Sequence, residues 1–123
     1  AVIGIQNMSL VEISRSVRDM GKRARGEGGS LTQAEMTGGT FGTSNLGMFG
    51  TDTFSAIIVP PNAGIIAVGA VKEKPIVEKG NVVVGQTMNA SISADHRVGD
   101  GAEAAILLGE FQKILENPVR LMI

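Results

Sequence analysis

The clearest alternation of apolar and polar positions lies between Gln86 and Asp95, and it predicts a strand there. The side chains of one face are apolar and belong to Met88, Ala90, Ile92 and Ala94. Those of the other face are polar and belong to Thr87, Asn89, Ser91 and Ser93. Because successive side chains of a strand point to opposite faces, this strand presents one face suited to an apolar core.

Other segments have the composition of strands, with turn residues between them. They are residues 1–5, 40–44, 55–59, 64–71 and 82–84. The segment 64–71 is apolar throughout, which is typical of a strand buried on both faces. Lys79-Gly80-Asn81 is typical of a hairpin tip, and Pro60-Pro61 ends the segment before 64–71.

Three segments have helical patterns. Ser9 and Glu12 form a capping box that opens a helix, and Thr32 and Glu35 form a second one. Apolar residues recur at helical spacing in the first helix, at Leu10, Ile13, Val17, Met20 and Ala24. Its basic residues fall largely off this stripe and are expected on a solvated face: Arg15, Arg18, Lys22, Arg23 and Arg25. The third helix is expected over residues 102–116, and the mixture of elements indicates an α/β domain.

Composition narrows the function classes. Apolar residues make up 43% of the 123 residues and the net charge is −1, which excludes a disordered chain and a nucleic-acid surface built on net charge. Without cysteine there is no disulfide, thiol nucleophile or thiolate metal site, and we expect no metal. No apolar run reaches the roughly 20 residues of a membrane span, and no basic leader or signal peptide is expected at the start.

The candidate chemistry centres on His96, the single histidine, in the stretch from Ser93 to Ala102. A predicted strand leads into it and a predicted helix leaves it. No other side chain here has an ordinary pKa near neutrality, so proton transfer at that pH depends on this imidazole. A lone histidine also commonly has no role. Asp100 has a structural interpretation of its own, as the N-cap of the helix, paired with Glu103.

Two motifs carry a resemblance to a known family. The first reads Asp95-His96-Arg97, two residues, then Asp100-Gly101-Ala102. The second reads Gly38-Gly39-Thr40-Phe41, then Ser44-Asn45-Leu46-Gly47, then Ile57-Ile58-Val59-Pro60-Pro61. Together they resemble the dihydrolipoamide acyltransferases, the E2 core enzymes of the 2-oxo acid dehydrogenase complexes. The resemblance extends in order over essentially the whole chain.

The resemblance implies a fold and a reaction. The expected fold is a chloramphenicol-acetyltransferase-like two-layer α/β sandwich, with a mixed β-sheet and flanking helices. The expected reaction moves an acyl group from S-acyl-dihydrolipoyl-lysine to coenzyme A without an acyl-enzyme. By position in the motifs, His96 would be the general base, Ser44 the oxyanion donor and Asp100 a supporting residue. Asp95 and Arg97 are expected to be structural residues or trimer contacts.

The resemblance covers only part of the family's catalytic domain. Residues 1–123 are expected to be only the C-terminal portion of the catalytic domain. The earlier half, with much of the coenzyme A pocket, would be missing, as would the lipoyl and peripheral-subunit-binding domains. Gly42 replaces the family's usual Thr or Ser and Gly99 replaces an aliphatic residue. Without its missing segment, the portion is expected to fold weakly or aggregate.

The family also implies partners. We expect a homotrimer that pairs Ser44 of one subunit with His96 of the next and assembles into a cubic or dodecahedral core. The tail Leu121-Met122-Ile123 is a candidate contact for that assembly. E1 and E3 components would bind through the missing domains. The compartment would be the bacterial cytoplasm or the mitochondrial matrix. The residues from Ser44 to Gly50 resemble the pyruvate-type members and favour acetyl as the acyl group, whereas residues 88–95 are closer to the branched-chain members.

Two alternatives stay open at this point. One is a serine hydrolase using Ser44, His96 and Asp100, although Leu46 occupies the second glycine position of a G-x-S-x-G nucleophile elbow. The other is a non-catalytic E2-like subunit, or an inactive fragment, that serves assembly alone. The intact Asp95-His96-Arg97 motif argues against this second alternative.

Overall fold

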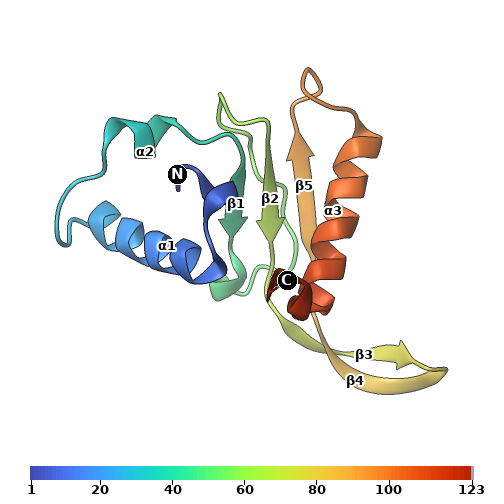
Figure 1. Ribbon diagram of the computed structural model, residues 1–123. Coiled ribbons are helices and arrows are strands. Elements are labelled where there is room, and N and C mark those ends of the chain that lie inside the picture. The colour runs from blue at the N-terminus through green and yellow to red at the C-terminus, as the bar shows by residue number, and fades with distance from the viewer. Residues whose placement is uncertain (123) are drawn as a thin grey trace. The chain divides into compact units, whose positions relative to one another are not determined.

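A computed structural model describes residues 1–122, which form two compact units. One unit is Ala1–Thr40 together with the residues from Glu110 onward, and the other is Phe41–Gly109. The elements in chain order are α1 (Leu10–Ala24), α2 (Gln33–Thr37), β1 (Gly42–Asn45), β2 (Gly64–Val68), β3 (Lys72–Glu78), β4 (Asn81–Thr87), β5 (Ala90–Ala94) and α3 (Gly101–Glu116) (Figure 1). The predicted α/β class is confirmed.

The unit Phe41–Gly109 is built on a three-stranded sheet with the order β1-β2-β5. β1 runs parallel to β2, and β5 runs antiparallel to it, so the sheet is mixed as predicted. The buried apolar residues among those described are Ile66, Ala67 and Ala70, in or just after β2. The central strand is therefore the one covered on both faces, as the apolar segment 64–71 predicts.

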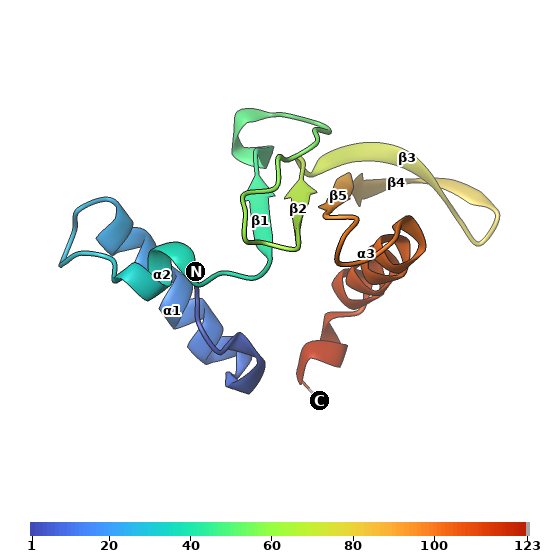
Figure 2. The same cartoon turned by 90° about the horizontal axis from the view of Figure 1, so that it is seen from above.

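The two faces of β5 carry different partners. On the polar face, the hydroxyl of Ser91 donates to the carbonyl of Phe54 at 2.6 Å, and the hydroxyl of Ser93 donates to the carbonyl of Ala56 at 2.9 Å. On the apolar face, Ile92 and Ala94 share a cavity with the first turns of α3, which lies to one side of β5 in Figure 2. The predicted alternation is thus confirmed within Ala90–Ala94, where the polar face of β5 holds another segment of chain.

β3 and β4 form a separate antiparallel hairpin that extends beyond the ends of β2 and β5 (Figure 1). Its tip is the predicted one, and both tip residues have positive φ, 50° at Lys79 and 80° at Gly80. Two residues with positive φ make the turn whose twist matches paired strands, and the second is a glycine because it has no Cβ to clash. At the base, the carboxylate of Asp52 lies 3.4 Å from Lys72 Nζ and 3.6 Å from Lys74 Nζ.

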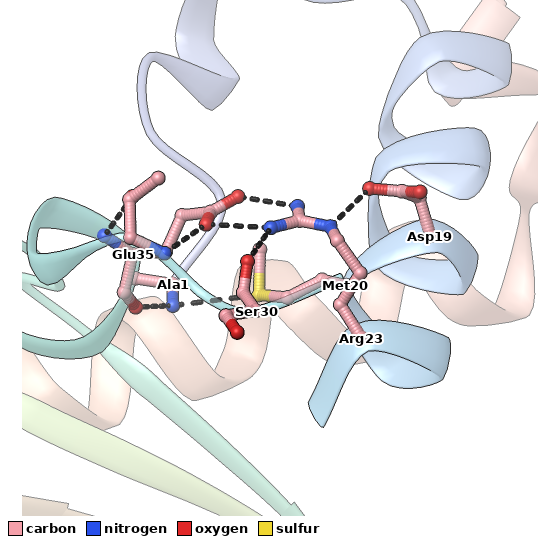
Figure 3. Close-up of polar contacts among 7 residues, drawn as sticks. Ala1, Asp19, Met20, Arg23, Ser30 and Glu35 are labelled. Atoms are coloured by element: carbon pink, nitrogen blue, oxygen red, sulfur yellow. Dashed lines mark hydrogen bonds and ion pairs between the residues drawn. The ribbon is translucent and has the colours of Figure 1, made fainter. Parts of the chain in front are cut away.

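Both predicted capping boxes are present in the other unit. Ser9 and Glu12 open α1, and Thr32 and Glu35 open α2. Arg23, near the end of α1, contradicts the expectation of a wholly solvated basic face. Its guanidinium donates to the carboxylates of Asp19 and Glu35 and to the carbonyl of Ser30 (Figure 3).

Several predicted element bounds are wrong. Residues 1–5 form no strand; a short 3₁₀ helix covers Ile5–Asn7 instead. The segment 55–59 forms no strand, because β1 pairs directly with β2 and the carbonyls of Phe54 and Ala56 accept serine hydroxyls instead of the N–H groups of a strand. The predicted strand 64–71 ends early, at Val68, and the predicted strand 86–95 is divided, because Gln86 and Thr87 end β4 and β5 covers only Ala90–Ala94. The hydrogen bond from Gly69 N to Asn89 O marks where β2 and β5 leave the sheet.

The surface keeps many large apolar side chains exposed. In the C-terminal segment, which forms a 3₁₀ helix over Pro118–Met122, Leu121 is 47% exposed and Met122 is 80% exposed. Ile123, the last residue of the tail singled out as an assembly contact, lies outside the described residues. Within residues 1–122, none of the helices has the length and hydropathy that a bilayer crossing requires.

Candidate active site

The end of β5 presents His96 on a tight turn. Asp95 N donates to the carbonyl of Ala63 at 2.8 Å, which extends the pairing of β5 with β2 by one residue. The carbonyl of Asp95 then accepts the N–H groups of Val98 and Gly99 at 2.9 and 3.3 Å. His96 is the second residue after β5 and is exposed, at the end of a strand as expected from the sequence.

Asp95 and Arg97 stabilise this turn from within. The carboxylate of Asp95 accepts the backbone N–H of Arg97 at 2.9 Å and its guanidinium at 2.6–3.1 Å. The hydrogen bonds from the Arg97 side chain, more than those from its backbone, lower the pKa of Asp95 to about 2. The same contacts raise the pKa of Arg97. This pair holds the loop rather than facing the cavity beside it, in keeping with its expected structural role.

Asp100 begins α3 with the capping arrangement predicted from the sequence. Its Oδ1 accepts the N–H of Glu103 at 2.9 Å, while its own N–H donates to Glu103 Oε2 at 3.0 Å. A Cβ on Gly99 would lie 2.7 Å from that same Glu103 oxygen. The small residue at 99 therefore leaves room for the Glu103 carboxylate to fold back onto the loop that carries His96.

His96 and Asp100 line one cavity of about 330 Å³. The residues that line it come from β5, the turn and the first turns of α3, all within the unit Phe41–Gly109. They are Ile92, Ala94, His96, Gly99, Asp100, Gly101, Ala104, Ala105 and Leu108. The structure thus brings together two of the three residues predicted for the site.

Ser44, the third predicted residue, lies elsewhere in the same sheet. It is opposite Ala67 of β2, and Ala67 is in turn opposite Ser91 of β5. From Ser91 the chain continues for about 13 Å, at roughly 3.3 Å per residue, before it reaches Asp95 and the turn. Within one chain Ser44 and His96 are therefore far apart, as expected from the family, and a serine–histidine pair for hydrolysis is not assembled.

The groups present suit proton transfer and hydrogen bonding. Within residues 1–122, the histidine and acidic side chains form no cluster of three or more able to hold a metal ion. An exposed imidazole at the mouth of a cavity can take a proton from a bound acid such as a thiol, provided that it is neutral. A hydroxyl such as that of Ser44 can donate to developing negative charge.

Comparison with known proteins identifies the family. Residues 1–123 match the model of the 2-oxoacid dehydrogenases acyltransferase catalytic domain. The chain belongs to this acyltransferase family. The family resemblance carried by the two motifs is thereby confirmed.

Relatives of this acyltransferase chain carry more than one acyl specificity in their names. It is 41% identical over 115 residues to the acetyltransferase component of the pyruvate dehydrogenase complex of Rickettsia felis. It is 40% identical over 116 residues to the succinyltransferase component of the 2-oxoglutarate dehydrogenase complex of Cupriavidus necator. It is 46% identical over 120 residues to the mitochondrial acetyltransferase component of Schizosaccharomyces pombe. Each match covers 94% of this chain, but only 27%, 27% and 24% of the relatives, so the chain spans about a quarter of their length.

Solved structures of acyltransferase cores share the fold. The dihydrolipoamide acetyltransferase of Azotobacter vinelandii superposes with a TM-score of 0.85 at 25% identity. A cubic core of the pyruvate dehydrogenase multienzyme complex also gives a TM-score of 0.85, at 24% identity. Both matches cover 97% of this chain and 48% of the other. These likenesses support the predicted chloramphenicol-acetyltransferase-like fold.

Proposed function

We propose that this acyltransferase chain contributes His96, Asp100 and Ser44 to the transfer of an acetyl group from S-acetyl-dihydrolipoyl-lysine to coenzyme A. The observation that carries the proposal is the position of His96 and Asp100 on one cavity at the end of β5. It gains weight because the chain matches an acyltransferase catalytic domain along its whole length.

The reaction needs one proton carrier and one site of charge stabilisation. His96 takes the proton from the coenzyme A thiol, and the resulting thiolate forms a carbon–sulfur bond to the acyl carbon. The carbonyl oxygen becomes negatively charged and is stabilised by the Ser44 hydroxyl. As the bond to the dihydrolipoyl sulfur breaks, the imidazolium returns the proton to that sulfur, so His96 ends as it began.

The separation of Ser44 and His96 within one chain favours a site shared between neighbouring subunits. We expect the homotrimer predicted from the family, in which each site takes Ser44 from one subunit and His96 from another. The spacing of three residues in a relative supports the roles proposed for Ser44, His96 and Asp100. A serine, a histidine and an asparagine were investigated in the catalytic mechanism of the Azotobacter vinelandii enzyme, and they are spaced as Ser44, His96 and Asp100 are here. This equal spacing supports matching Asp100 to that asparagine.

The length of the chain supports a partial domain. It covers 48% of the solved Azotobacter core, so we infer that residues 1–123 are the C-terminal portion of the catalytic domain. Lipoyl and peripheral-subunit-binding domains, and the E1 and E3 components that they engage, would belong to the remainder of the protein. A cubic core is named for one neighbour, and relatives are both bacterial and mitochondrial. The motif around Ser44 favours acetyl as the acyl group.

The test is acyl transfer from S-acetyl-dihydrolipoamide to coenzyme A by the full-length protein. His96→Ala should lower kcat by about 10²–10⁴, the usual contribution of one general base. Val98→Ala, in the same exposed turn, is the matched control and should leave the rate unchanged. Near-wild-type transfer by the His96→Ala protein would overturn the proposal and favour a non-catalytic core subunit.

A further inference from the structure

The turn that carries His96 is held through the backbone N–H groups of the four residues that follow it. The first three donate to the carboxylate or the carbonyl of Asp95, at 2.9–3.3 Å. The fourth, the N–H of Asp100, donates instead to Glu103 Oε2 at 3.0 Å. Glu103 is therefore the acceptor that ties the far end of the turn to α3.

Glu103 and Asp100 hold each other through a reciprocal pair of hydrogen bonds. The Glu103 carboxylate accepts the N–H of Asp100, and the N–H of Glu103 donates to Asp100 Oδ1 at 2.9 Å. Rotation of either side chain breaks one of the two bonds. Because Glu103 is exposed, water screens its charge, so the contact itself, rather than the charge, holds the turn.

Gly99 is small for reasons of space rather than of backbone conformation. Its φ lies outside the left-handed region that favours glycine, so its backbone does not exclude an alanine. A Cβ at this position would, however, lie 2.7 Å from Glu103 Oε2, closer than Cβ atoms approach other atoms in proteins. The carboxylate would have to swing away and would release the Asp100 N–H. Residue 99 can therefore be larger only if Glu103 gives up this contact.

The position of His96 determines how well it can act as a base. A general base works within about 2.6–3.2 Å of the group that it deprotonates, and a displacement of about 1 Å can slow a reaction about 100-fold. We propose that Glu103 is a positioning residue for His96, and that Gly99 is required because the Glu103 carboxylate occupies the space beside it. This inference rests on the proposed acyl transfer and adds to it a residue that acts through the backbone of the turn.

Substitution of Glu103 in the full-length protein tests the positioning role. Glu103→Ala removes the acceptor and should lower kcat about 10–100-fold, with KM for both substrates nearly unchanged. Glu103→Gln keeps an oxygen acceptor and should retain a kcat close to wild type. Glu116→Ala, in the last turn of α3, is the matched control, and all rates are measured well below the thermal midpoints. A wild-type kcat in Glu103→Ala, or equal losses in Glu103→Ala and Glu103→Gln, would overturn the inference.

Gly99 and Glu103 should behave as one unit in a double-mutant cycle. Gly99→Ala displaces the carboxylate and should lower kcat about as much as Glu103→Ala does. When Glu103→Ala is already present, Gly99→Ala should cause no further loss, because the Cβ of residue 103 is 3.9 Å away. Gly109→Ala is the control, since a Cβ there has no described atom within 4 Å. A wild-type kcat in Gly99→Ala, or losses that multiply in the double variant, would overturn the inference.

Amide hydrogen exchange reads the contact independently of the reaction. The Asp100 amide should exchange faster in Glu103→Ala and in Gly99→Ala than in wild type, and at a near-wild-type rate in Glu103→Gln. Unchanged exchange in Glu103→Ala would overturn the inference even if kcat fell. Absence of acyl transfer by the wild-type protein, or wild-type transfer by His96→Ala, would instead overturn the proposed function, so the two failures are distinguishable.

Discussion

Ser44 and His96 lie in one compact unit but are kept apart by the register of a single mixed sheet. Ser44 is paired with Ala67 of β2, whereas His96 follows Asp95, whose N–H donates to Ala63, the residue just before β2. A change in the side chains cannot close this separation, because it is set by backbone pairing. Any mechanism that uses both residues on one substrate needs two chains.

Mixing inactive variants tests this consequence directly. Full-length His96→Ala and Ser44→Ala proteins are co-assembled by subunit exchange. If sites are shared, some interfaces hold both wild-type residues, and acyl transfer should recover to about a quarter of wild type or less. Exchange is verified by mass labelling, and each variant mixed with itself is the control. No recovery despite exchange would mean that each site forms within one chain.

Ser44→Ala should reduce turnover rather than binding. Loss of one oxyanion donor typically lowers kcat by about 10²–10³, because the hydrogen bond forms with charge that exists only in the transition state. KM for both thiol substrates should stay nearly constant. Thr43→Ala, an exposed neighbour on the same strand, is the control. A loss confined to KM would indicate that Ser44 positions substrate instead.

Asp100→Ala should loosen the start of α3. The change removes the acceptor for the Glu103 N–H, and loss of such a cap costs about 1 kcal/mol of stability. Amide exchange in the first turn of α3 should accelerate, and transfer should fall as the loop carrying His96 loses its anchor. Asp100→Asn keeps a capping oxygen and should behave close to wild type. Equal loss in both variants would show that the charge of Asp100 is required.

The substitution Arg23→Lys should not preserve the contacts that Arg23 makes. The guanidinium makes two parallel hydrogen bonds to Glu35, at 2.8 and 2.5 Å, while also reaching Asp19 and Ser30 (Figure 3). A lysine ammonium lacks this planar geometry. Amide exchange across residues 30–37 should therefore rise in Arg23→Lys and Arg23→Ala alike. Arg18→Lys, on the exposed face of α1, is the control. Unchanged amide exchange in both Arg23 variants would show that Arg23 does not stabilise residues 30–37.

The same ion pair should make stability depend on pH in the acid range. Hydrogen bonds from Arg23, followed by those from Thr32, lower the pKa of Glu35 from 4.5 to about 2. Because the unfolded chain takes up the proton first, the stabilisation is complete above about pH 4.5 and is lost as pH falls toward about 2. Thermal midpoints of wild type and Glu35→Gln should differ at pH 6 and converge near pH 2. A difference independent of pH would exclude Glu35 ionisation as its source.

Short-range sequence patterns were enough to predict much of the fold and part of the candidate site. The capping boxes at Ser9, Thr32 and Asp100 depend on residues three apart, so they can be predicted from the sequence. The same holds for the hairpin tip at Lys79-Gly80 and for the alternation that delivers His96 at the end of β5. Each of these features is decided within a few neighbouring residues.

Other features depend on partners distant in sequence. The segment 55–59 has strand composition but no strand partner. The hydroxyls of Ser91 and Ser93 instead donate to carbonyls in and just before this segment. Nothing local separates Arg23 from the exposed Arg18, because Glu35 comes twelve residues later. The cavity beside His96 depends on how α3 packs on β5. Its only signal in the sequence is the small residues of α3 at helical spacing.

The attachment of the β3–β4 hairpin has a mechanical consequence. One carboxylate, Asp52, serves two lysines at its base, at 3.4 and 3.6 Å, and these partly exposed pairs are weak and screened by salt. The main connection of the hairpin is then the chain itself, which runs from β2 into β3 and from β4 into β5. Val77, Val82 and Val84 meanwhile present apolar side chains to solvent. With few contacts to fix it and valines exposed, we expect the hairpin to act as an arm whose position is set by any surface that it contacts.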